Sequence, residues 1–348
     1  MFKDLKYLFA YIAPVSAICG FYLGGWWYYA AFLVGFVFIP LLETTMPVNG
    51  SNLSYEEELS QVKKPWFDLL IYLNLPILFF ILYLFFTAIG KEGLNTYEYI
   101  GLILSMSVIM GSTGINVAHE LGHRVNVIET TMAKFMLMPA LYMHFNIEHN
   151  LGHHKHVATD EDPSSARLGE SVYKFWIRST VNSYINAWKI EHTRLKKAGL
   201  SIVSYHNEMI LFQLAQLAYL ITIYVLFGMK GLIAGVLVAI GGFLMLETVN
   251  YIEHYGLRRN ILPNGRYEPA SFIHSWNSNH ELGRIFLYEL TRHSDHHFKS
   301  TRKYQVLRHF DESPQLPYGY PSSILLSLIP PLWFRIMNNR VKAAQLSN

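Results

Sequence analysis

Residues 98–123 read EYIGLILSMSVIMGSTGINVAHELGH, and this stretch joins an apolar segment of membrane-spanning length to two histidines. About 20 apolar residues cross a hydrocarbon core, so 98–118 is predicted to be a transmembrane helix. His119 and His123 are four residues apart and share one face of a helix that continues out of the membrane. The chain is therefore expected to present imidazoles at a membrane surface.

Five further apolar segments have a similar length and complete a prediction of six transmembrane helices. Hydrophobic residues make up 51% of the chain, and long uninterrupted apolar stretches exclude an ordinary soluble domain. The predicted spans are 8–24, 26–43, 66–90, 98–118, 207–227 and 229–253. Two shorter apolar stretches that contain prolines, 135–145 and 324–334, are expected to be re-entrant or interfacial. We expect an all-α integral membrane protein, a single domain over residues 1–348.

The basic residues fall almost entirely on one side of this predicted topology. With six spans, the N-terminus and the segments 44–65, 119–206 and 254–348 all lie on the same side of the membrane. The only basic residues predicted on the opposite side are Lys91 and Lys230. Because cytoplasmic loops collect Lys and Arg, we expect every histidine motif to face the cytoplasm, at a bacterial inner membrane. The net charge of +3 gives no reason to expect a nucleic-acid partner.

Nine of the sixteen histidines are concentrated in four short motifs: HELGH at 119–123, HNLGHH at 149–154, NYIEHYG around His254, and HSDHH at 293–297. Nine imidazoles exceed the four to six ligands of one ion, which predicts a dinuclear metal site in a cytoplasmic cap. Helical spacing suggests that His149 and His153 bind the same ion, with His154 turned about 100° towards the second. The predicted ligands are His119, His123, His149, His153, His154, His254, His293, His296 and His297.

The single cysteine, Cys19, lies inside the first apolar segment and is expected to be an inert buried thiol. One cysteine excludes a disulfide framework, an iron–sulfur cluster and a cysteine-based zinc site within this chain.

Acidic residues in or beside the histidine motifs are expected to orient the ligands. A ligating imidazole usually donates its other N–H group to a carboxylate or a carbonyl. We assign this role to Glu120 and Asp295, and to Glu247, which lies in an apolar span seven residues before His254. Hydrogen bonding to a neighbouring helix explains Glu247 equally well. The other carboxylates in suitable positions are Glu148, Asp160, Asp162 and Glu253.

Two other metal-based functions fit the histidines less well. HELGH matches the HExxH motif of zinc metalloproteases, in which the glutamate is a general base, but that function leaves seven clustered histidines unused. A metal-ion transporter should bind its ion near the membrane midplane, whereas these motifs lie at helix ends. His156 breaks the four-residue spacing and is left outside the ligand set. Ordinary structural or surface roles are expected for His144, His192, His206, His274, His280 and His309.

The order of the motifs HELGH, EHNLGHH, NYIEHYGL and LTRHSDHHF, with HVATDEDP after the second, closely resembles the integral-membrane alkane 1-monooxygenases. The similarity covers nearly the whole chain, as far as the PYGYP segment at 317–321. It is stronger than the resemblance to membrane fatty-acid desaturases and hydroxylases, which remain the main alternative. The chain departs from the family in having Thr291 where Gln is frequent, and in the additional His156.

The resemblance implies a non-haem di-iron enzyme that uses O₂ to convert n-alkanes, taken from the lipid bilayer, to 1-alkanols. In the family, electrons pass from NADH through rubredoxin reductase to rubredoxin. Rubredoxin needs two pairs of cysteines, and this chain has one cysteine and no GxGxxG motif after a strand, so the donor must be a separate protein. Basic residues that would suit an acidic electron carrier are Arg258, Arg259, Arg302, Lys303 and Arg308.

Small side chains follow one side of the fourth predicted span. Steps of three or four residues back from His119 reach this side, which faces the expected metal site. Small residues allow two membrane helices to pack closely, or they leave room for an alkyl chain, and the sequence leaves both interpretations open. The residues are Ser105, Val108, Gly111, Ser112 and Ile115, and all except Ser105 are taken as tentative tunnel residues.

Overall fold

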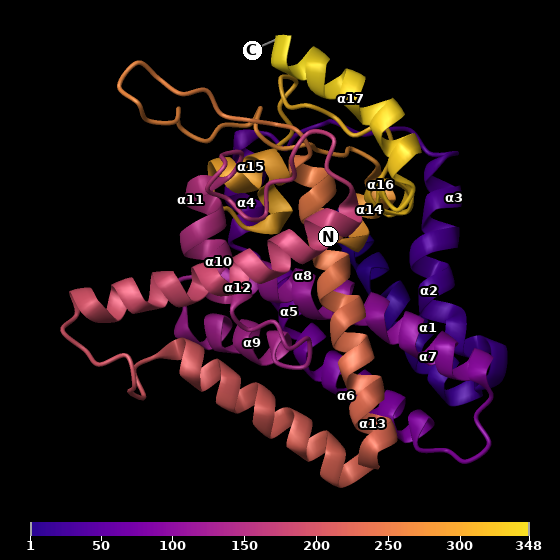
Figure 1. The fold of residues 1–348 in the computed structure, drawn as a ribbon. Coiled ribbons are helices and arrows are strands. Elements are labelled where there is room, and N and C mark those ends of the chain that lie inside the picture. Colours follow the sequence, from indigo (N-terminus) through magenta and orange to yellow (C-terminus); the bar gives the residue numbers. More distant parts are fainter. Residues whose placement is uncertain (1, 347–348) are drawn as a thin grey trace. The chain divides into compact units, whose positions relative to one another are not determined.

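The computed structural model describes residues 2–346, which form helices joined by loops, with no β-strand in that range (Figure 1). Isolated β-bridges occur in the loops, for example between Ile261 and Tyr267. The prediction of an all-α protein is therefore confirmed.

Five helical stretches within residues 2–346 are long and apolar enough to cross a membrane: Asp4–Leu23, Gly25–Glu43, Pro65–Ile89, Thr96–Gly122 and Glu208–His254. The first stretch consists of η1 (Phe2–Tyr11) and α1 (Ile12–Leu23), and the second of η2 (Gly25–Tyr29), α2 (Ala30–Leu33), η3 (Val34–Phe38) and α3 (Ile39–Glu43). The third consists of α5 (Pro65–Tyr72) and α6 (Asn74–Ile89). The fourth consists of α7 (Thr96–Ile109), η4 (Met110–Ile115) and α8 (Asn116–Gly122). The chain is a multi-pass membrane protein, as predicted. Neither 135–145 nor 324–334 belongs to a candidate span.

The fifth stretch, α13 (Glu208–His254), contains two of the six predicted spans. Its 47 residues would extend about 70 Å as a straight helix, more than twice the thickness of a hydrocarbon core. Gly228 interrupts it with φ 66° and ψ −167°, a conformation that favours glycine, and Figure 1 shows the chain folding back there. The fold-back divides α13 between the predicted spans 207–227 and 229–253. Six crossings stay a prediction, because length and composition alone identify five candidates.

Contacts divide the chain into two compact units. The first unit comprises the residues up to 38, 65–147 and 187–246, and the second comprises 39–64, 148–186 and 247 onward. Helix α9 (Val127–Leu137) lies in the first unit, and α10 (Phe145–Glu148), α12 (Val172–Lys197) and α13 contribute residues to both. The remaining helices of the second unit are α4 (Tyr55–Val62), η5 (His149–His153), α11 (His154–His156), α14 (Glu281–Phe286), α15 (His293–Phe298), η6 (Tyr304–Val306), α16 (Tyr320–Ser327) and α17 (Pro330–Leu346). A single domain over the whole chain stays a prediction.

Glycines bring the fourth candidate span close to α13 within the first unit. A Cβ atom at Gly111 would lie 2.6 Å from the Sδ atom of Met245, and one at Gly242 would lie 2.5 Å from Cγ of Met110. Real Cβ atoms do not approach other atoms this closely, so the small residues permit the contact between the helices. This geometry supports the packing interpretation of Gly111, and its role in a substrate tunnel stays a prediction.

Cys19 lies on α1 and is exposed at the surface of the protein. The prediction of a buried thiol is therefore wrong. An apolar segment that spans a membrane is covered partly by lipid, so apolar surroundings in the sequence do not imply burial within the protein.

Candidate metal centre

Four histidines of the second unit, carried by three helices, direct their ring nitrogens towards one another. His153 ends η5, His254 ends α13, and His293 and His297 lie one turn apart on α15. One nitrogen of each lies within 4.8 Å of one nitrogen of every other. The Nε2 atom of His293 is 3.2 Å from Nε2 of His254 and 2.9 Å from Nε2 of His297. All four side chains are buried, and we refer to them as the tetrad.

His153 shows most clearly that the tetrad fits a metal ion. Its Nδ1 atom donates a hydrogen bond of 2.9 Å to Oδ2 of Asp162, which leaves the lone pair on Nε2. Nε2 is buried and has no hydrogen-bond partner among the residues that the structure describes. A buried acceptor left unpaired costs about 1–3 kcal/mol, and a cation shared with the other three imidazoles would remove that cost.

Asp162 is itself held firmly. Its Oδ2 atom also accepts a hydrogen bond of 2.5 Å from the Ser165 hydroxyl, and Oδ1 accepts one of 3.0 Å from the backbone N–H of Ser164. Burial alone would raise the pKa of Asp162, but its interaction with His153 and the hydrogen bond from Ser165 lower it. The carboxylate is therefore ionised, and it fixes both the tautomer and the orientation of the His153 ring.

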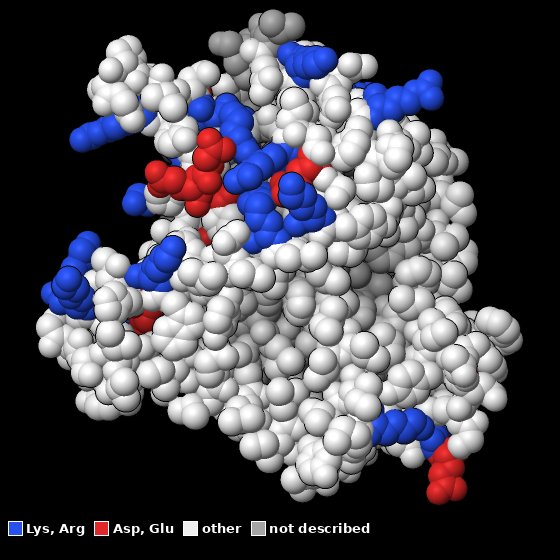
Figure 2. Space-filling model, viewed as in Figure 1, with Lys and Arg blue, Asp and Glu red and all other residues white. Residues whose placement is uncertain are grey.

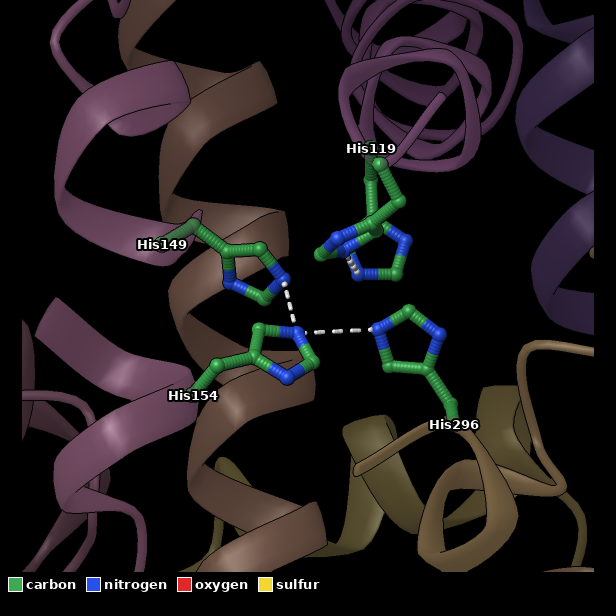
Figure 3. Close-up of side chains that lie close together, drawn as sticks. His119, His149, His154 and His296 are labelled. Carbon is green, nitrogen blue, oxygen red and sulfur yellow. Dashed lines mark hydrogen bonds between the residues drawn. The ribbon is translucent and has the colours of Figure 1, made fainter. Parts of the chain in front are cut away.

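Three more histidines of the second unit form a second group, which we call the triad (Figure 3). The Nε2 atom of His154 lies 3.1 Å from Nε2 of His149 and 3.1 Å from Nε2 of His296. Figure 3 shows the His154 ring between the other two, with dashed lines along these two distances. The triad brings together residues from the second and the fourth sequence motif.

The expectation that His149 and His153 would bind one ion is wrong, because they fall in different groups. That expectation assumed an α-helix, in which residues four apart share a face. Instead η5 is a π-helix, whose hydrogen bonds join residues five apart, so His149 aligns with His154. On α15 the regular spacing holds, and His293 and His297 belong to the tetrad while His296 belongs to the triad. Each of these two motifs thus contributes to both groups.

The first unit contains the remaining pair of predicted ligands. His119 lies on α8 and His123 follows its last residue, and their Nε2 atoms are 3.4 Å apart. The prediction that these two histidines share a face is confirmed. The Phe145 ring lies 6.3 Å from the His119 ring, centroid to centroid, so an aromatic side chain stands beside the pair.

Two of the three carboxylates chosen from the sequence contact arginines. Glu120 accepts a hydrogen bond of 2.6 Å from Arg124, and Asp295 accepts one of 2.8 Å from Arg302. Asp295 also accepts from the backbone N–H of Arg308 at 2.7 Å, so its contacts hold the loop that follows α15. Glu247 is buried on α13 in the second unit. A role for these carboxylates in orienting ligands stays a prediction.

Two carboxylates that the sequence named only as further candidates do contact histidines of the tetrad. Asp162 holds His153, as described above. The Oε2 atom of Glu253 lies 3.2 Å from Nε2 of His293, and its Oε1 atom accepts a hydrogen bond of 2.8 Å from Tyr320. In the sequence, only the position of Asp162 and Glu253 beside a histidine motif indicated that they would contact a histidine. Glu148 and Asp160 have the same kind of position. Asp160 is largely exposed and lies 3.8 Å from Arg258.

The histidines expected to be ordinary lie outside both groups among the described residues. His156 pairs with Glu161 at 2.8 Å and is partly exposed. His274 lies 3.2 Å from a carboxylate oxygen of Glu268, within the loop after α13.

The basic residues expected to attract an electron carrier are partly engaged inside the second unit. Arg302 pairs with Asp295, and Arg308 pairs with Glu58 of α4. Arg259 donates hydrogen bonds to the backbone carbonyls of Lys155 and Glu268. Figure 2 accordingly shows basic and acidic side chains intermingled on the upper part of the visible face.

Comparison with known proteins shows similarity of the chain to the fatty acid desaturase family and to monooxygenases. The family model described as fatty acid desaturase matches residues 96–324. The chain is 38% identical over 321 residues to alkane 1-monooxygenase 2 of Pseudomonas aeruginosa, covering 91% of this chain and 85% of the relative. It is 37% identical over 345 residues to alkane 1-monooxygenase of Ectopseudomonas oleovorans, covering 97% and 86%. It is also 31% identical over 337 residues to the xylene/toluene monooxygenase hydroxylase component XylM of Pseudomonas putida, covering 94% and 86%.

Proposed function

Because this chain belongs to the alkane 1-monooxygenases, within the wider fatty acid desaturase family, we propose that it hydroxylates the terminal methyl group of n-alkanes. The reaction would consume one O₂, two electrons and two protons, and would give a 1-alkanol and water. The observation that carries the proposal is the tetrad of four buried imidazoles. Asp162 orients the His153 ring so that the lone pair of Nε2 points towards the other three. Such a nitrogen-only set suits a redox-active transition metal.

We propose that the nine predicted ligands hold two iron ions. The tetrad would hold one. The three imidazoles of the triad leave positions open on an ion that takes four to six ligands, and His119 and His123 would fill two of them. Imidazole also suits copper and zinc, and the family is the reason to propose iron. When bound, the irons would supply the activation of O₂ and the oxidising power that an unactivated C–H bond requires.

The residues of the chain would orient the ligands and keep water away from the centre. Asp162 fixes the His153 ring. Glu253, held by Tyr320, lies beside Nε2 of His293, the nitrogen that faces the other imidazoles, and therefore borders the position of the ion itself. Burial of the tetrad excludes water, which protects a strongly oxidising reaction from side reactions. An alkane concentrates in the bilayer by the hydrophobic effect, so it would reach the centre without polar recognition. We retain Val108, Gly111, Ser112 and Ile115 as the residues proposed to line its path.

We propose that rubredoxin, reduced by NADH through its reductase, delivers the electrons on the cytoplasmic side of a bacterial inner membrane. Arg302, Arg308 and Arg258 all pair with carboxylates, so Arg259, which bonds to backbone carbonyls, is the better candidate for contact with an acidic carrier. Arg259 bonds to the carbonyl of Lys155, the residue next to His154, which would bring the carrier near the triad.

The proposal is tested with the purified protein in lipid vesicles, supplied with rubredoxin, its reductase, NADH and O₂. We expect terminal alcohols from n-alkanes and about two irons per chain. Oxidation of toluene or xylene without oxidation of n-alkanes would place the enzyme with its relative XylM instead. A desaturated acyl product, or peptide cleavage with one bound zinc, would refute the proposal.

A further inference from the structure

Helix α12 exposes apolar side chains at the surface of the protein. At about 100° per residue, one side of the helix carries Val172, Ser179, Ser183 and Ala187, all of them buried. The opposite side carries Ile177 and Val181, which are 73% and 52% exposed. A helix on a water-covered surface normally shows the reverse pattern, with polar residues outward. The exposed face therefore calls for an apolar environment outside the protein.

Lysines border this apolar face. Lys174, Lys189 and Lys196 are exposed, and at about 100° per residue they fall along one edge of the face. The last turn of α12 contains Arg194, Lys196 and Lys197, and Figure 2 shows basic side chains gathered at this end of the helix. An apolar face with a basic edge is the pattern of a helix that lies in the headgroup layer of a membrane. The lysines would then meet anionic phosphates.

The loop after α12 continues the same pattern. It joins α12 to the start of α13 (Figure 1). Because α13 begins with a candidate membrane span, we expect the loop to lie where the chain enters the bilayer. Its tip exposes Ile202, Val203 and Tyr205, and the last two are 84% and 77% exposed. A tyrosine with aliphatic neighbours at the end of a span is characteristic of the membrane interface.

We propose that α12 and the tip at 202–205 form a surface-bound element that lies in the headgroup layer of the leaflet at the start of α13, and that Lys174, Lys189 and Lys196 bind anionic phospholipid headgroups. The occupant is the lipid surface, because the basic edge complements anionic headgroups and because the tip is continuous with a span. A second copy of the chain would cover the apolar face but would not need the lysines. None of these residues belongs to the metal-binding groups, so the proposal does not depend on which metal the protein binds.

The test uses nitroxide labels on single cysteines in a Cys19→Ala background, with the full chain in vesicles that contain phosphatidylglycerol. Labels at Ile177→Cys and Val203→Cys should be accessible to O₂ and protected from a water-soluble nickel complex. A label at Asn182→Cys, exposed on a different side of the same helix, is the matched control and should show the opposite preference. Equal access of nickel to the labels at 177, 203 and 182 would overturn the proposal. Strong spin–spin broadening between labels at 177 would also overturn it, because it would show that a second copy covers the face.

A separate measurement tests whether the three lysines bind anionic phospholipid headgroups. Native mass spectrometry of the protein released from mixed vesicles should show phosphatidylglycerol retained in preference to phosphatidylcholine. Each substitution of Lys174, Lys189 or Lys196 by Gln should weaken that preference about fivefold, as expected for one lysine at an anionic surface. Lys91→Gln, a lysine far from α12 in the sequence, should leave the preference unchanged. An unchanged preference in the triple variant would overturn the assignment of the lysines.

Discussion

Replacing Asp162 by Asn should selectively weaken metal binding at the tetrad. The two side chains have nearly the same shape, so the fold should persist, but the variant loses the negative charge that faces His153 Nδ1 at 2.9 Å. Removing a carboxylate that supports a metal-bound histidine typically weakens affinity 10- to 100-fold, or about 1.4 to 2.7 kcal/mol. The hydrogen bond to Ser165 at 2.5 Å also has to rearrange, so we expect the upper part of that range.

Competition with a chelator measures this effect directly. The wild-type protein and the variant are loaded with ferrous iron, and the release of each iron is followed against chelator concentration. One of two irons should be released at a 10- to 100-fold lower chelator concentration in the variant, while the other is released nearly as before. Asp160→Asn is the matched control, because Asp160 is two residues away and largely exposed, and it should behave as wild type. Unchanged release of both irons from the Asp162 variant would refute the role assigned to this carboxylate.

Three further predictions address the ligands, the substrate path and the pH dependence of stability. His296→Ala should abolish hydroxylation and lower the iron content without affecting membrane insertion, whereas His206→Ala should leave both unchanged; an active His296 variant would contradict the ligand set. Gly111→Phe, eight residues before His119, should keep activity on short alkanes and lose it on long ones. This selectivity should remain when Met245→Ala relieves the close contact at Gly111, whereas equal loss at every chain length would indicate disturbed packing instead. Burial would raise the pKa of Glu170, but its hydrogen bonds to Arg178 lower it below 4.5, so its contribution to stability is present above pH 4.5 and is lost as the pH falls through the lowered value. Glu170→Gln should therefore lower the unfolding temperature at pH 7, with a difference from wild type that shrinks in acid, and a difference independent of pH would contradict this assignment.

The helical class and the membrane-spanning segments could be predicted because they depend on the length of apolar stretches. The break at Gly228 was also anticipated as the boundary between 207–227 and 229–253, since a 47-residue helix is too long for one crossing. The exposure of Cys19 could not be predicted in the same way. An apolar sequence does not distinguish a side chain that faces lipid from one that faces another helix.

The histidine motifs identified the metal-binding residues to test, but not how they divide between ions. The division depends on η5 being a π-helix, because its hydrogen bonds join residues five apart and so align His149 with His154 in place of His153. Local sequence favours neither geometry. The sequence could not single out Asp162 among the carboxylates for a related reason: Asp162 and Asp295 are both close to histidines in sequence, and only the course of the loop after α11 brings Asp162 to His153.

Imidazole nitrogens are proposed to bind two metal ions in this protein. X-ray absorption at the metal edge, combined with metal analysis, tests this most directly. The purified protein should contain two irons per chain, each with a shell of nitrogen ligands and no sulfur. His297→Ala should remove one iron through the tetrad, and His154→Ala should remove the other through the triad. A single bound zinc in the wild-type protein, or an iron that remains bound when both substitutions are combined, would contradict this assignment.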